Sequence, residues 1–548
     1  SFRENGKTKK KTIANLSDWP ADRIEALGRL LKGEKLVGVG DLFETVTSFQ
    51  HGNVDAVLKA VRGLDLERVI ASKPCRERDL VVSMVAAQVL EPQSKLAFTR
   101  WWKTTTLPQE LGLGEVKDDE LYAAMDWLLE RQMRIEKKLA GRHLKADELV
   151  LYDLTSSYFE GNKCKLAKIG YSRDGKRGSL QVNYGLLADK RGCPVSVSVF
   201  EGNTADPKTV GTEVELLKQR FNIEAFVLVG DRGMIGQKQI DTELRPRGVD
   251  WITALKTGAI RELVEGGSIQ LGLFDERNLF EFEHADYPGE RLVACRNTEL
   301  QKRRAHKRDA LIAATVKELE KVRAMARSGK LKSAGKIGIR AGRVANKYKV
   351  AKHFVLEPKD NDFDFRVNEE SVAAEARLDG IYVVRTSLPK ERMSAKDAVR
   401  NYKSLTQVER AFRSIKTMDL HVRPIRHWIE DRVRAHIFLC MLAYYVEWHM
   451  QEALRPMLFA DEEQDAKATR DPVAPAKRSR SALAKIATKE TADGFEAHSM
   501  RSLLKNLGGI VKNICKRKGD TNNVTTAIFS TPTPAQSRAF SLLDAIKP

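Results

Sequence analysis

Two short apolar runs that each end in aspartate constrain the fold of this chain most strongly. Leu149–Asp153 and Ala225–Asp231 have the length and composition of buried strands. The residues between and after them predict a hairpin (180–188 with 193–200), two helices (209–221 and 235–244) and a further strand (249–255). Strands in hairpin order, followed by alternating helix and strand, predict a mixed sheet with helices on its faces.

The length of the chain, 548 residues, indicates several units, because one domain rarely reaches this length. Phe43, Val46 and Phe49 recur with Leu42 at helical spacing, so the region before the sheet is expected to be helical. Residues 104–114 followed by a helix over 118–134 resemble a helix-turn-helix, although any small helical domain shows the same periodicity. The expected units are an N-terminal arm (1–34), a helical and DNA-binding domain (35–146), a first part of the sheet domain (147–258), a basic α+β insertion (259–378), a second part of the sheet domain (379–454), and a linker with a basic C-terminal segment (455–548).

The charge of the chain favours a polyanionic partner. The net charge is +20, and residues 296–352 hold 18 Lys or Arg against four acids. Because this cluster is so strongly positive, it favours a phosphate-binding surface over an ordinary solvated face. A membrane is the weaker alternative, because the longest apolar run, Ile437–Val446, is far shorter than the roughly 20 residues of a membrane span. The expected DNA contacts in the basic insertion are Lys302, Arg303, Arg304, Lys307, Arg308, Lys347 and Lys349.

Several other function classes find no support. The stretch Gly329–Ile337 has the wrong spacing for a phosphate-binding loop, and neither a Gly-x-Ser-x-Gly elbow nor a His-Glu-x-x-His helix occurs, so no nucleotide cofactor is expected. The six cysteines include no Cys-x-x-Cys pair, which argues against zinc and against a disulfide framework. The polar first residues show no signal peptide, and a reducing cytoplasm fits best.

The residues that could carry chemistry are carboxylates. If the two apolar strands are neighbours, Asp153 and Asp231 come within reach of one Mg²⁺, although a strand-end aspartate often only caps the following turn. Tyr402, Glu409 and Lys416 are spaced by seven residues, so on one helix they form a single stripe. Arg413 lies beside that stripe. The alternative is an exposed helix face with a Glu409–Arg413 ion pair.

A family resemblance bears on this choice. The motifs are Asp153-Leu-Thr-Ser, Gly230-Asp-Arg-Gly-Met and Tyr402-x6-Glu409-x6-Lys416. Over roughly residues 147–450 the chain resembles bacterial insertion-sequence transposases of the DDE type. The similar subgroup has a Tyr–Arg–Glu–Lys signature and a large insertion before the glutamate. One departure is Leu405, where the signature has arginine; Arg413 or Arg410 could supply the missing phosphate contact.

The resemblance implies an RNase H-like core in which Asp153, Asp231 and Glu409 bind two Mg²⁺ ions, with Mn²⁺ as a substitute, for cleavage and transfer of DNA strands. It implies double-stranded DNA partners (terminal repeats and target), a homodimer that pairs two ends, cut-and-paste transposition and a bacterial cytoplasm. Tyr402 and Lys416 would hold the DNA backbone. Two alternatives stay open: an idle transposase kept for DNA binding, and an RNase H-like nuclease that does not join strands.

Overall fold

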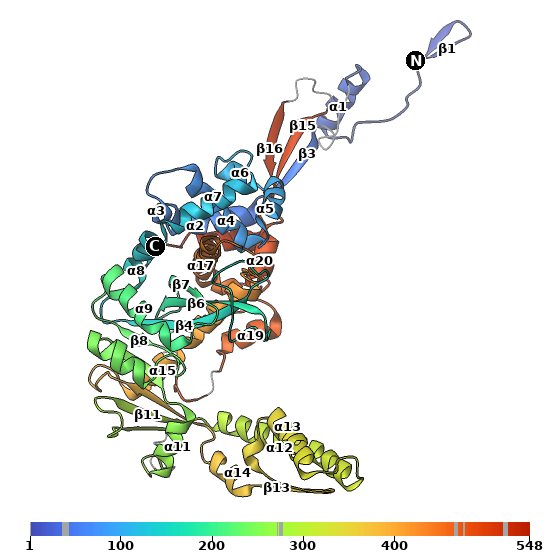
Figure 1. Cartoon of the computed structure of the whole chain (residues 1–548). Helices are drawn as coiled ribbons and strands as arrows, with labels where there is room; N and C mark the ends of the chain where they lie inside the picture. Colours follow the sequence, from blue (N-terminus) through green and yellow to red (C-terminus); the bar gives the residue numbers. More distant parts are fainter. Residues whose placement is uncertain are drawn as a thin grey trace.

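A mixed nine-stranded sheet forms the centre of the protein (Figure 1). The computed structural model describes residues 2–34, 43–270, 272, 274, 278–464, 470–474, 477–518 and 524–547, without the side chain of Met418. The strands of this sheet are β4 (Leu149–Tyr158), β5 (Lys168–Ile169), β6 (Leu180–Asp189), β7 (Pro194–Glu201), β8 (Val227–Val229), β9 (Asp250–Ala254), β10 (Leu279–Phe282), β11 (Arg291–Arg296) and β14 (Ile381–Thr386).

The order of these strands puts β4 between an antiparallel half and a parallel half. β4 pairs antiparallel with β6, which pairs antiparallel with β7. On its other side β4 pairs parallel with β8, and β8 pairs parallel with β9. The sheet then continues antiparallel through β14, β11 and β10. The mixed sheet and the hairpin predicted from the sequence are confirmed.

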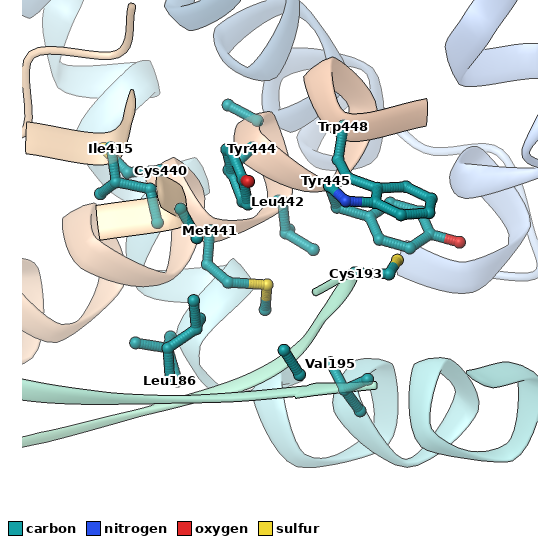
Figure 2. Packing of buried hydrophobic residues seen from close by; sticks show 14 of the residues in the cluster. Leu186, Cys193, Val195, Ile415, Cys440, Met441, Leu442, Tyr444, Tyr445 and Trp448 are labelled. Atoms are coloured by element: carbon teal, nitrogen blue, oxygen red, sulfur yellow. The ribbon is translucent and has the colours of Figure 1, made fainter. Parts of the chain in front are cut away.

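Helices cover the sheet as the sequence predicts. Two of them follow the predicted ranges: α9 (Val210–Glu215) with η4 (Leu216–Arg220), and α10 (Gln237–Gln239) with η5 (Ile240–Leu244). The long, almost wholly buried α17 (Glu430–Ala453) packs against β7. Figure 2 shows its Met441 and Tyr445 over Leu186 and Val195 of the hairpin. Within the described residues, no helix has the length and apolar character needed to cross a membrane.

The N-terminal region is not purely helical as predicted. Phe43, Val46 and Phe49 lie in a strand, β3 (Phe43–Gln50), and Leu42 lies outside the described residues. β3 pairs with β15 (Val511–Arg517), which pairs with β16 (Thr525–Phe529), so its partners come from the far end of the chain. The remaining elements of both ends are β1 (Phe2–Glu4), β2 (Lys7–Lys9), α1 (Ala21–Leu31), α2 (Gly52–Gly63), α3 (Leu66–Ile70), α4 (Arg76–Leu90), α5 (Lys95–Trp101), η2 (Trp102–Thr104), α6 (Leu107–Glu110), α7 (Asp118–Leu129), α8 (Gln132–His143), η10 (Arg455–Met457), α19 (Arg480–Thr488), α20 (Met500–Leu507) and α21 (Pro534–Leu543).

The helix expected to read DNA has an unsuitable surface. It ends at Leu129, earlier than predicted, and α7 packs against α4 and α17 with Leu121, Met125 and Leu128 fully buried. Its first turn carries Asp118, Asp119 and Glu120, whose negative charges would repel phosphates. The first part of the predicted linker and basic C-terminal segment (455–548) is not simply a linker either, because α19 packs into the fold through Ala482 and Lys485.

The basic insertion begins later than the predicted boundary at residue 259. β10 and β11 lie within the predicted insertion, yet they extend the central sheet next to β14. A separate unit, residues 298–376, comprises α12 (Thr298–Arg327), α13 (Ala334–Lys347), η8 (Ala351–His353), β12 (Phe354–Lys359), β13 (Asp362–Val367) and α14 (Glu369–Ala376). This α12–α14 unit has its own core around Leu319, Ile337 and Phe363. Its strands β12 and β13 pair antiparallel as a hairpin.

Two buried glutamates beneath β7 make stability depend on pH. Burial raises the pKa of Glu213, in α9, to about 8, and it raises the pKa of Glu136, in α8, to about 7. Between the unfolded pKa near 4.5 and these values the folded chain holds more protons than the unfolded chain. Their contribution is therefore favourable below pH 4.5, and it is lost as the pH rises through 7 and 8.

Glu213→Gln is expected to raise the Tm at pH 9 while leaving it nearly unchanged at pH 5. The neutral amide avoids a buried charge whose cost is on the order of 5 kcal/mol. Thermal unfolding at both pH values measures the difference, with Glu224→Gln, an exposed glutamate, as the control. Equal shifts of Tm at pH 5 and pH 9 would contradict the assignment.

Candidate active site

The pairing of β4 with β8 brings two aspartates to adjacent positions. In this parallel register Leu149 pairs with Val227 and Leu151 pairs with Val229. Two residues further along each chain are Asp153 and Asp231, so the same register continued puts them side by side. Asp153 is not at a strand end as predicted, because β4 runs on to Tyr158. It lies instead where β8 has ended, and the missing neighbour opens one side of β4.

Each aspartate is held through one carboxylate oxygen. Oδ1 of Asp231 accepts hydrogen bonds from the backbone N–H groups of Gly233 (3.0 Å) and Met234 (2.8 Å). This is the turn-capping role that was the alternative interpretation from sequence. Oδ1 of Asp153 accepts one from the N–H of Leu154 at 2.8 Å. These contacts fix the direction of both carboxylates, and capping by one oxygen does not prevent ligation by the other.

A helix pair brings the third carboxylate over β4. Tyr402 lies near the end of α15 (Ala395–Lys403), and Glu409 lies in α16 (Leu405–Arg413) after a break at Ser404. The helix α16 buries Leu405, Val408 and Phe412 and packs against β4. The amphipathic spacing of these apolar residues turns Glu409 toward solvent on the other face. Leu405 therefore packs in the core. The signature of the resembled subgroup has arginine at this position.

Electrostatic effects show that the three carboxylates and the phenol share one environment. Burial, together with the charges of Asp231 and Glu409, raises the pKa of Asp153 to about 7, although the N–H of Leu154 and the charge of Arg173 act to lower it. Burial also raises the pKa of Tyr402 to about 12, again with contributions from all three acids. Four residues that the sequence analysis selected therefore gather at one place.

A group of carboxylates in which the charges of Asp231 and Glu409 raise the pKa of Asp153 suits a divalent cation. The repulsion that favours protonation of Asp153 would be relieved by positive charge among the oxygens. Asp153, Asp231 and Glu409 are hard oxygen donors of the kind that Mg²⁺ prefers. Their spacing exceeds a single compact shell: within the described part of the chain, three ligand atoms come within 4.8 Å of one another only at His143, Cys193 and His449. Two ions roughly 3.5–4 Å apart would span a wider set of ligands.

Lys416 is placed differently from its prediction. The chain forms a π-helical turn at η9 (Ser414–Met418), which takes Lys416 off the stripe of Tyr402 and Glu409. Its side chain is buried, and Nζ donates to Oδ1 of Asp174 at 3.0 Å. Arg423 also pairs with this oxygen. Burial lowers the pKa of Lys416, and it works to raise that of Asp174, but the two cations outweigh it and hold the Asp174 pKa below its ordinary value.

A cleft of about 320 Å³ adjoins Glu409 and is rich in cations. The Lys416–Asp174–Arg423 cluster forms one wall, and Arg413 is the exposed cation at its edge. Arg410, the other predicted substitute for the signature arginine, does not line this cleft. The cleft is lined by Thr155, Arg173, Asp174, Glu409, Phe412, Arg413, Lys416, Thr417 and Arg423.

Three residues of this cleft were not predicted from the sequence: Arg173, Asp174 and Arg423. Arg173 is held by Asp206, whose two carboxylate oxygens each lie 2.6 Å from Nη2. The one available signal was the short segment Gly170–Gly178, in which glycines alternate with Arg173, Lys176 and Arg177 between two strands. Nothing local in the sequence predicts that this loop reaches Lys416, 242 residues later.

Asp174→Ala is expected to destabilise the protein by on the order of 3 kcal/mol, because it leaves Lys416 and Arg423 without their buried counter-charge. Asp174→Asn, which keeps an acceptor, should cost less. Urea unfolding measures both. Glu160→Ala is the matched control, since its ion pair with Arg426 is exposed and exposed pairs are worth about 0–1 kcal/mol. If Asp174→Ala lowers the free energy of unfolding no more than the control does, the Lys416–Asp174–Arg423 cluster does not stabilise the protein as proposed.

The predicted DNA contacts in α12 and around the end of α13 fall into two groups. Arg304, Lys307, Arg308 and Lys349 line a second cleft, of about 430 Å³, together with Arg261 and Lys352. We call it the α12 cleft. Lys302, Arg303 and Lys347 are exposed outside it. Arg308 is largely committed to Asp379, since both are buried and their charged groups lie 2.7 Å apart.

Comparison with known proteins places the chain. The family described as "Transposase DDE domain" matches residues 145–446. This range includes both aspartates, Glu409 and the α12–α14 unit. No curated protein matches. Among solved structures, the cryo-EM structure of a piggyBac transposase synaptic complex with hairpin DNA is 7% identical, with a TM-score of 0.32, and the match covers 83% of this chain and 77% of that one. A likeness at this TM-score does not establish a shared fold.

Proposed function

The chain belongs to the family of transposases with a DDE domain, and on this premise we propose that Asp153, Asp231 and Glu409 are its catalytic carboxylates. The observation that carries the proposal is their convergence: the β4–β8 register aligns the two aspartates, and α16 packs on β4 beneath Glu409. The strand order β7-β6-β4-β8-β9, with β4, β8 and β9 parallel, supports an RNase H-like core.

Each residue has a distinct task in the proposed reaction on DNA. Asp153, Asp231 and Glu409 would hold two divalent ions, Mg²⁺ or Mn²⁺. Such ions, when bound, activate the attacking oxygen and stabilise the leaving oxygen in phosphoryl transfer. The phenol of Tyr402 keeps its proton at neutral pH, because its pKa is raised to about 12, and can therefore donate to a phosphate oxygen. Arg413 and Arg173 offer charge to the backbone beside the cut.

We further propose that the element is a bacterial insertion sequence moved by a cut-and-paste route, with a homodimer of this chain on its paired ends. The α12 cleft supports this, because all of its cations except Arg261 lie in a unit with its own core, apart from the carboxylates. A second phosphate-binding surface would let one protomer hold DNA beyond the cut. Aromatic side chains of the α12–α14 unit could also stack on a DNA base. Of these, Phe354 and Phe363 are buried, whereas Tyr348 lines the α12 cleft.

Strand joining is the activity that tests the proposal. Purified protein is incubated with Mg²⁺, DNA carrying the element's terminal repeats, and a target plasmid, and product junctions are sequenced. Recombinant molecules with the element's ends joined to the target are expected. Nicks or breaks without joining would indicate the nuclease alternative. Binding without cleavage, in Mg²⁺ and in Mn²⁺, would indicate a protein retained for DNA binding.

A further inference from the structure

Two histidines and a cysteine from three distant elements meet beneath α17. His143 ends α8, Cys193 lies in the turn just before β7, and His449 lies in α17. One ligand atom from each side chain lies within 4.8 Å of the other two. Figure 2 shows Cys193 at the end of its strand, pointing toward Tyr445 and Trp448. This group lies outside the carboxylate site and outside both basic clefts.

The separations are close to those of a metal shell. Sγ of Cys193 lies 3.7 Å from Nε2 of His449, and the rings of His143 and His449 are 5.6 Å apart between centroids. Ligands at about 2.3 Å (sulfur) and 2.0–2.1 Å (nitrogen) around a tetrahedral ion are themselves about 3.5 Å apart. Small side-chain movements would therefore suffice to close the group around one ion.

We propose that His143, Cys193 and His449 form a zinc site that ties α8 and the start of β7 to α17. Zinc takes this mixture of imidazole and thiolate ligands, and water would complete the tetrahedron. On binding, a zinc–sulfur bond replaces the S–H bond of Cys193, and the thiol proton passes to solvent.

Positive and negative charges balance around the three side chains, and Arg191 must move before His143 can bind an ion. Arg142 and Arg191 lie near the histidines, and Asp189 and Glu452 lie near Cys193. The two nitrogens of His143 lie 2.9 Å from the hydroxyl of Tyr445 and 3.3 Å from Nη2 of Arg191. Arg191 has a largely exposed side chain, so it can release His143 to the ion. Arg191→Ala should therefore tighten zinc binding.

Cobalt provides a direct test, because a Co²⁺–thiolate bond gives a charge-transfer absorption that carboxylate ligands cannot give. The full-length protein is freed of metal with a chelator, titrated with Co²⁺ and then challenged with Zn²⁺. The expected result is one thiolate–cobalt site per chain, displaced by Zn²⁺, absent in Cys193→Ser and reduced in His449→Asn. Cys440→Ser is the matched control: Cys440 also faces a histidine, His436, but in the described part of the chain no third ligand atom joins them in a comparable group.

Two measurements keep the test decisive. Zn²⁺ should raise the Tm of the wild type and of Asp231→Asn, which lacks a proposed catalytic ligand, but not that of Cys193→Ser. An absorption band that survives in Cys193→Ser would overturn the site, as would a wild type that shows neither the band nor a zinc-dependent rise in Tm. Should Cys193→Ser fail to fold, the wild-type titration and His449→Asn decide alone.

Discussion

Asp231→Asn and Glu409→Gln are each expected to lower the rate of DNA cleavage at least a thousandfold, while DNA binding stays within about threefold of wild type. Both amides preserve the shape of the side chain but remove the negative charge that holds a divalent ion. Binding should survive, because the cations of both clefts are untouched. Single-turnover cleavage of terminal-repeat DNA in Mg²⁺ measures the rate, and a gel-shift titration measures the affinity.

The control for this pair is Glu391→Gln, an exposed glutamate ahead of α15 and outside both clefts, which should cleave like wild type. Full cleavage by either acid variant would remove that residue from the site. Full cleavage by both would mean that the convergence over β4 is a structural feature of the sheet. Because Asp231 also caps its turn through Oδ1, the Tm of Asp231→Asn should be checked; asparagine retains that acceptor.

The two aspartates could be predicted from sequence because their signal is local. An apolar run that ends in a charge marks the end of a strand correctly for Asp231, whereas β4 continues past Asp153 to Tyr158. A seven-residue spacing shows which side chains share a helix face. Tyr402 and Glu409 are indeed electrostatic neighbours. Lys416 is the failure, because a π-helical turn breaks the regular period between it and Glu409. Its partner Asp174 lies 242 residues away, beyond the reach of any periodicity.

The terminal regions were misjudged for a related reason. Phe43, Val46 and Phe49 recur every third residue, which fits a helix, yet the segment is a strand because β15 pairs with it from the other end of the chain. The predicted start of the insertion at residue 259 was wrong, although the excess of Lys and Arg begins at residue 296, close to the start of α12. The excess of Lys and Arg follows α12 and α13, whereas β10 and β11 belong to the sheet by hydrogen bonding alone.

DNA binding is expected to weaken about a thousandfold or more between 50 and 200 mM salt, if both clefts together contact six or more phosphates. Each phosphate contact releases about 0.9 counterion, so the slope of log K against log salt counts the contacts. Lys307 and Lys349 are two exposed cations of the α12 cleft, whereas Arg308 is paired with Asp379. Lys307→Ala with Lys349→Ala should therefore make the slope shallower by about 2.

The matched control is Lys317→Ala, on the same helix and exposed, but outside the α12 cleft. It removes one unit of the same charge, so a general effect of net charge would appear in it as well. If the slope falls in the double variant alone, phosphates lie in the α12 cleft. If the control lowers the slope by half as much as the double variant, the whole basic face attracts DNA without a specific track. A slope unchanged in both variants would place the DNA on the Glu409 cleft alone, and the α12–α14 unit would then need another partner to explain its charge.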